Sequence, residues 1–133
     1  HAADLEVALG EADIVSCATL ATEPLVLGAW LKPGQHLDLV GAFTPDMAEA
    51  DDEALARARV YVDTRDGALV ESGELVGAIA RGVIGAEDIQ GDLFDLARGA
   101  ARGRAGADEI TLFKSVGTAL EDFAAATLAI EPT

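Results

Sequence analysis

The residues best suited to chemistry lie between positions 110 and 123, where a lysine and a serine interrupt an apolar run. Lys114 and Ser115 follow the apolar stretch 110–113, and Val116-Gly117 then open an Ala/Leu-rich helix. The start of a helix carries unpaired backbone N–H groups at the positive end of the helix dipole. This arrangement predicts either a pocket for a phosphate or carboxylate, or an ordinary helix start that Ser115 caps and at which Lys114 is only a helix-end charge.

The other candidate nucleophiles, bases and metal ligands are isolated in the sequence. Cys17 has no histidine at a readable spacing, which favours a buried, inert thiol over a nucleophile. His36 follows a Pro-Gly turn and is expected to have a structural or surface role rather than a catalytic one. The acidic cluster 49–53 is expected to supply charge to a helix start, and no HExxH, CxxC or DxD motif supports a metal site.

Composition limits the possible partners and compartment. The 133 residues make about one domain, and 24 acidic against 9 basic residues give a net charge of −15. Such a charge argues against nucleic acid and anionic membranes as partners. No apolar run is long enough to span a bilayer. Because Cys17 is the single cysteine, we expect a reducing compartment, by default the cytoplasm.

Strand and helix patterns alternate along the chain over short connections. Strands are expected at 12–18, 36–41 and 59–63, the first of them buried on both faces. Arg102 and Arg104 could clamp an anion, but in a Gly/Ala loop they are expected to be solvated. This alternation predicts parallel βαβ units that resemble the second half of a doubly wound, Rossmann-like sheet. Ligands of such sheets lie beyond the carboxyl ends of the strands, here 16–19, 40–43 and 63–65. The phosphate-binding Gly-x-Gly-x-x-Gly turn is absent from the chain.

The strand ends, taken with the 110–117 feature, resemble the ornithine cyclodeaminase/mu-crystallin family. No single matching stretch is specific for the family, but the order and the number of the matching stretches are specific. The resemblance covers the C-terminal part of the family through stretches 12–19, 30–34, 36–45, 62–65, 71–75 and 109–117.

The resemblance implies a homodimer with a nicotinamide-binding Rossmann domain and a separate substrate and dimer domain. Residues 1–106 would be part of the cofactor domain, and 107–133 a C-terminal helix at the cofactor and substrate cleft, returning towards the substrate and dimer domain. The implied cofactor is NADPH or NADH, with no metal. By position, Thr19 should lie against the dinucleotide, Val40 at the nicotinamide end, Ser115 in hydrogen-bonding range of the nicotinamide, and Val116 towards a small imino acid substrate.

One departure separates this chain from the cyclodeaminase branch of the family. Cyclodeaminases carry an aspartate two residues after the glycine of the Val-Gly pair, whereas this chain has Phe43, which cannot act as a general base. The resemblance is therefore to reductases that convert Δ1-pyrroline-2-carboxylate or Δ1-piperideine-2-carboxylate to proline or pipecolate. The alternatives are an ornithine cyclodeaminase, which is an ammonia lyase, and a non-catalytic, crystallin-like protein that binds NADPH and a ligand. The family's substrate-anchoring Arg and Lys precede His1, so we expect this stretch alone to be inactive.

Overall fold

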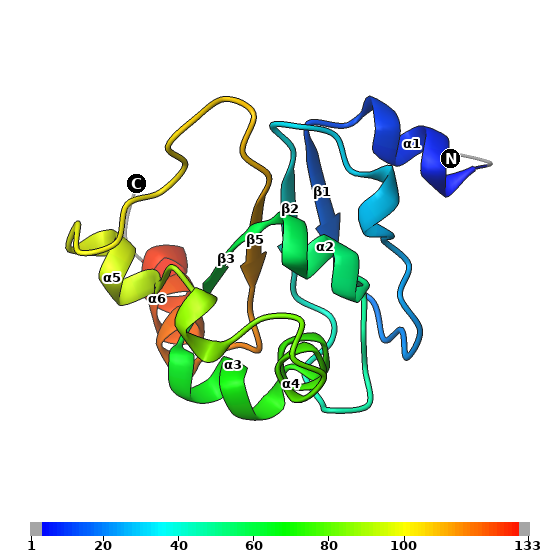
Figure 1. Cartoon of the computed structure of the whole chain (residues 1–133). Helices are drawn as coiled ribbons and strands as arrows, with labels where there is room; N and C mark the ends of the chain where they lie inside the picture. Colours follow the sequence, from blue (N-terminus) through cyan, green and yellow to red (C-terminus); the bar gives the residue numbers. More distant parts are fainter. Residues whose placement is uncertain (1–3, 131–133) are drawn as a thin grey trace.

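A parallel five-stranded sheet organises the computed structural model, which describes residues 4–130 (Figure 1). Neighbouring strands run in the order β1-β2-β5-β3-β4, and every pair is parallel. The α/β architecture predicted from the alternating patterns is confirmed. The strands are β1 (Ile14–Cys17), β2 (His36–Leu39), β3 (Arg59–Val62), β4 (Gly91–Asp92) and β5 (Thr111–Lys114).

The helices begin where short polar side chains can accept hydrogen bonds from the first-turn N–H groups. Asp4, Asp51, Thr64, Ser72 and Asp92 cap the first five α-helices in this way. No helix within 4–130 is long and apolar enough to cross a membrane. The helices are α1 (Leu5–Glu11), η1 (Gly28–Trp30), α2 (Asp52–Arg57), α3 (Arg65–Glu71), α4 (Gly73–Ala80), η2 (Ala86–Asp88), α5 (Leu93–Ala97) and α6 (Ala119–Ile130), where η denotes a 3-10 helix.

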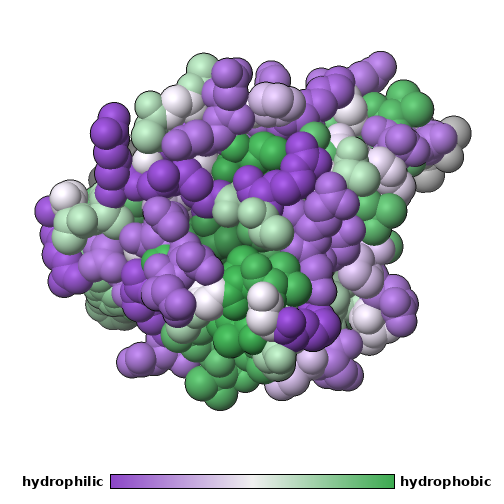
Figure 2. All heavy atoms as spheres, viewed as in Figure 1, coloured by the Kyte–Doolittle hydropathy of each residue, from purple (hydrophilic) through white to green (hydrophobic). Residues whose placement is uncertain are grey.

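Alternate strand residues build the core on one face of the sheet, as the pleat requires. Six strand residues on this face pack with Leu55 of α2, Ala68 of α3 and Leu75 of α4: Cys17, Leu37, Leu39, Val60, Val62 and Leu112. Figure 2 shows an apolar area over α4 within a largely polar surface.

The first strand is half-buried, and the prediction that both its faces are covered is wrong. Ile14 is 67% exposed, because its side chain lies on the face of β1 opposite the core. β1 also forms the edge of the sheet and pairs only with β2 among the described residues. On the same face, Ser16 donates a hydrogen bond to Asp38 on β2 (2.7 Å). β1 therefore leaves one strand edge free.

The stretch 110–123 folds differently from its sequence interpretation. Residues 111–114 are the central strand β5, between β2 and β3, and α6 begins only at Ala119. Thr118 caps α6 instead of Ser115: the Glu121 N–H donates to Thr118 Oγ1 (3.4 Å) and the Thr118 N–H to Glu121 Oε2 (3.3 Å). Residues 115–117 are thus a loop between a strand and a helix.

Candidate cofactor cleft at the carboxyl ends of the strands

The four residues predicted to face cofactor or substrate lie at one edge of the sheet. Thr19 follows β1, Val40 follows β2, and Ser115 and Val116 follow β5. Because β1, β2 and β5 are adjacent and parallel, their carboxyl ends meet at this edge, which we call the cleft edge. The structure therefore brings the predicted residues together, while their contacts to a ligand remain a prediction.

The cleft edge exposes apolar side chains next to these positions. Leu20 is 71% exposed, Val40 40% and Phe43 43%. Val116 is half-buried beside α3, where a Cβ added to Gly67 would lie 3.1 Å from its Cγ2. Exposed apolar surface at the end of a sheet can take up a flat ring.

Ser115, Val116 and Gly117 are held by the carboxylate of Asp63, which follows β3 and is fully buried. Its Oδ2 accepts hydrogen bonds from Ser115 Oγ (2.9 Å), Val116 N (2.8 Å) and Gly117 N (2.8 Å). The anion that these donors bind is thus a side chain of the protein itself. The prediction of a phosphate or carboxylate ligand at this turn is wrong for that reason.

Lys114 is buried in the core instead of being a charge at a helix end. Its position on β5 points it to the apolar face of the sheet, and its side chain has no exposed surface. The Lys114 Nζ lies 3.3 Å from Glu74 Oε2 and 4.0 Å from Glu49 Oε2. Glu74, on α4, also accepts from the backbone N of Glu49 (2.8 Å) and from Ser72 Oγ (3.1 Å). We call Glu49, Glu74 and Lys114 the buried ion group.

Glu49 joins the buried ion group to the cleft edge. Its Oε1 accepts from Thr19 N (2.6 Å) and Thr19 Oγ1 (2.8 Å), and its Oε2 accepts from Gly41 N (2.8 Å). A Cβ added to Gly41 would lie 2.0 Å from the Thr19 carbonyl oxygen, so only glycine fits between these strand ends. From the sequence, Glu49 was expected to be one of the acids that supply charge to a helix start. That interpretation holds for its neighbour Asp51, which caps α2, but not for Glu49 itself.

Cys17 and His36 are not the reactive groups of this edge. Burial, and then the nearby carboxylates of Glu49 and Asp38, raise the pKa of Cys17 to about 11, so the thiol stays protonated at neutral pH. His36 opens β2, at the opposite end of the strand from the cleft edge, and its Nδ1 lies 2.8 Å from Thr111 Oγ1. Burial lowers the pKa of His36. The expected burial of Cys17 is confirmed, and the contact of His36 with Thr111 agrees with the structural role that was one of its two expected roles.

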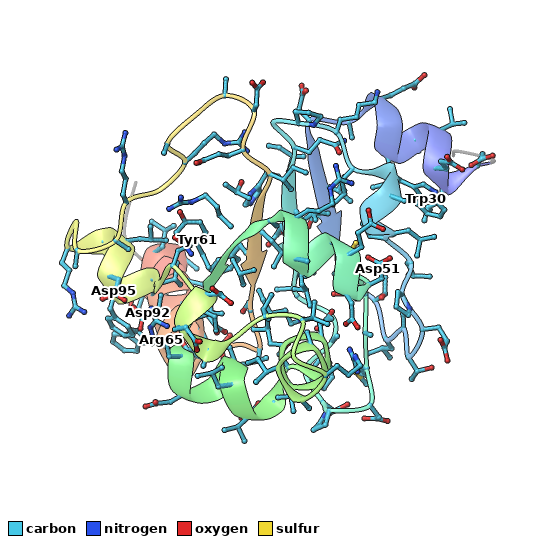
Figure 3. The ribbon with its side chains drawn as sticks, viewed as in Figure 1. Trp30, Asp51, Tyr61, Arg65, Asp92 and Asp95 are labelled. Carbon is cyan, nitrogen blue, oxygen red and sulfur yellow. The ribbon has the colours of Figure 1, made fainter. Side chains whose placement is uncertain are left out.

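A second charged group lies at the carboxyl ends of β3 and β4, beside α5 (Figure 3). Arg65 donates to the Ile89 carbonyl (2.9 Å), and its Nε lies 3.9 Å from Asp95 Oδ2. The hydrogen bond from Arg98 lowers the pKa of Asp95, with a smaller contribution from the backbone N–H of Asp92. Arg104 donates to Gln35 O (3.2 Å) and Thr111 Oγ1 (3.0 Å). Arg102 and Arg104 are both exposed, so the prediction of solvated positions is confirmed. Over residues 4–130, no group of three His, Cys, Asp or Glu side chains could hold a metal ion.

The ornithine cyclodeaminase/mu-crystallin family matches residues 2–132. The chain belongs to this family. A Δ1-pyrroline-2-carboxylate reductase of Paracoccus denitrificans is 55% identical over 116 residues, which cover 87% of this chain and 37% of that protein. A solved structure of a Δ1-pyrroline-2-carboxylate reductase of Thermococcus litoralis, in complex with NADH and L-proline, is 40% identical to this chain, with a TM-score of 0.89. The match covers 93% of this chain and 38% of the solved chain. An archaeal alanine dehydrogenase dimer with bound NAD is 34% identical to this chain, with a TM-score of 0.86. That match covers 94% of this chain and 38% of the dehydrogenase chain.

This member of the ornithine cyclodeaminase/mu-crystallin family therefore spans little more than a third of the length of these relatives. The two residues that sequence reasoning missed are Glu49 and Asp63. Each is a fully buried acid whose partners lie at the cleft edge, Glu49 bonding a residue 30 positions away and Asp63 one 52 positions away. Neither forms a local motif, and the one available signal is an acid directly before or after an apolar run.

Proposed function

We propose that the protein, at its full natural length, is an NAD(P)H-dependent reductase of cyclic imino acids. Its substrates would be Δ1-pyrroline-2-carboxylate or Δ1-piperideine-2-carboxylate, and its products proline or pipecolate. The observation that carries this proposal is Phe43, which stands 43% exposed at the cleft edge where a cyclodeaminase would need an acid. The 55% identity to a Δ1-pyrroline-2-carboxylate reductase supports the same activity.

The residues of this chain would position the cofactor, and the dihydronicotinamide, when bound, would supply a hydride to the imine carbon. Val40 offers an apolar contact to the nicotinamide ring. Thr19 lies against the dinucleotide, Ser115 lies at the polar edge of the nicotinamide, and Val116 faces the substrate. The buried hydroxyl of Ser115 is oriented by Asp63, which fixes the loop that presents Val116.

The rest of the assembly follows the same proposal. Residues 1–106 and the central strand β5 belong to the nicotinamide-binding domain, whose first half pairs with the free edge of β1. The domain boundary expected at residue 106 therefore moves to the end of β5, and the segment after it leads to the substrate and dimer domain. The protein is a homodimer, which is supported by the dimeric alanine dehydrogenase and by exposed Leu120, Phe123 and Leu128 on α6. Its free thiol, Cys17, supports a cytoplasmic location.

The test is a steady-state assay of the natural-length protein with each imine and with NADH or NADPH. We expect imine-dependent oxidation of the cofactor and formation of the corresponding cyclic amino acid. Release of ammonia from ornithine without imine reduction would identify a cyclodeaminase instead. Saturable cofactor binding without turnover of either substrate would identify a crystallin-like binding protein.

A further inference from the structure

Glu49 connects the cleft edge to the buried ion group, and no role has been assigned to it. Its carboxylate has no exposed surface and accepts three hydrogen bonds from two strand ends, two of them from Thr19 and one from Gly41. Lys114 lies 4.0 Å from one of its oxygens. A buried carboxylate is costly unless hydrogen bonds and an opposite charge compensate it, and the hydrogen bonds of Glu49 come from the two strand ends.

We infer that Glu49 is a positioning residue for the cofactor cleft, and this inference rests on the proposed function. The Gly41 N–H belongs to the peptide group that also contains the Val40 carbonyl, so the bond to Glu49 orients the backbone that carries Val40. The Thr19 N–H belongs in the same way to the peptide that joins Ala18 to Thr19. One carboxylate therefore sets the spacing and tilt of the two strand ends that the cofactor would contact.

A carboxylate side chain suits this set of contacts. It offers two acceptor oxygens, one for the two Thr19 donors and one for the Gly41 N–H. A glutamine has one acceptor oxygen, and its NH2 group would face an N–H at the other position. Glu49→Gln therefore keeps the shape of the side chain and releases one of the two strand ends.

The same variant should fold, because it leaves the remaining charges balanced. The buried ion group holds two carboxylates and one ammonium, and Glu49→Gln removes one of the two negative charges. Lys114 then keeps Glu74 at 3.3 Å as its partner. Loss of an ion pair becomes severe when it leaves a charge without a partner in the core, and this variant leaves no such charge.

The experiment compares Glu49→Gln with Leu55→Ala in the natural-length protein. Leu55 is a core residue of α2, 1% exposed, and its truncation should lower the melting temperature without moving the cleft edge. We expect Glu49→Gln to raise both the KM for NADH and the Kd for NADH, measured by nucleotide fluorescence, by roughly tenfold, with kcat within about twofold. Leu55→Ala should leave both constants for NADH within about twofold of the unaltered protein.

Two results would overturn the inference. One is an unchanged Kd for NADH in Glu49→Gln, and the other is an equal change in Leu55→Ala, which would mean that lost stability alone moves the constant. A protein that binds NADH and reduces neither imine would refute the proposed function by itself. In that case the Kd for NADH would still decide the role of Glu49.

Discussion

Ser115 Oγ donates a hydrogen bond to Asp63 Oδ2 across 2.9 Å, which joins the residue after β5 to the residue after β3. The same oxygen accepts hydrogen bonds from the backbone N–H groups of Val116 and Gly117. The loop at the candidate cleft therefore owes its shape to a buried acid on a neighbouring strand. Its conformation does not depend on a bound anion.

Asp63→Asn should destabilise the fold by about 1.5–3 kcal/mol, the usual contribution of hydrogen bonds to a charged group. An asparagine has one acceptor oxygen, whereas Asp63 uses Oδ1 for the Thr64 N–H (2.6 Å) and Oδ2 for the three loop donors. Urea unfolding of the natural-length protein measures the loss. Asp66→Asn, an exposed position on α3, is the matched control and should change stability by less than about 0.5 kcal/mol. Equal effects of the two substitutions would contradict the assigned role of Asp63.

Lys114→Met should cost about 3–5 kcal/mol, because it leaves the carboxylates of Glu49 and Glu74 buried without their cation. Adding Glu74→Gln to this variant should restore part of the lost stability, since it removes one of the unpaired charges. Thermal unfolding of both variants gives the comparison. Exposed Lys32 provides the control through Lys32→Met, which should shift the melting temperature far less. A Lys114→Met protein as stable as this control would show that the buried ion group contributes nothing.

Gly41→Ala should destabilise the protein by about 1–3 kcal/mol, because the added methyl group would overlap backbone atoms of Thr19. It should also weaken NADH binding, since the strand ends after β1 and β2 would be forced apart. Gly103→Ala is the matched substitution, as a Cβ there meets nothing within 4 Å. Melting temperature and NADH affinity, measured on both variants, should change for Gly41 and stay constant for Gly103.

Cys17 should resist alkylation in the native protein at pH 8 and react once the protein is unfolded. Burial raises its pKa from 9.0 to about 11, so the reactive thiolate is scarce at pH 8. Between pH 9 and about pH 11, the folded state therefore binds more protons than the unfolded state. The stability linked to Cys17 is therefore complete below pH 9 and is lost as the pH rises towards 11. Mass spectrometry after iodoacetamide treatment provides the measurement, and rapid labelling of the folded protein would contradict the burial of this thiol.

Much of the scaffold was predictable because its signals are local. The apolar runs around β1, β2 and β3 and the helix-start acid Asp51 each act through neighbours in the chain. β4, with two residues, is too short to show a period. β5 escaped prediction because its last residue is Lys114, a type that is almost never fully buried unless it is paired.

The cleft edge was predictable in place and not in detail. Parallel strands bring their carboxyl ends together, so the places of Thr19 and Val40 followed from the pattern of strands. The place of Ser115 came from the family resemblance, because β5 was not predicted. The acids that hold those positions, Glu49 and Asp63, act across 30 and 52 residues of sequence. Such pairs depend on the strand order β1-β2-β5-β3-β4, which no local pattern encodes.

Transfer of a labelled hydride tests the central claim most directly. The natural-length protein would be supplied with Δ1-pyrroline-2-carboxylate and with NADH or NADPH carrying deuterium at the transferable position. The account predicts proline with one deuterium on the carbon that bears the carboxylate, detected by mass spectrometry. Absence of labelled proline from a protein that binds the labelled cofactor would contradict it.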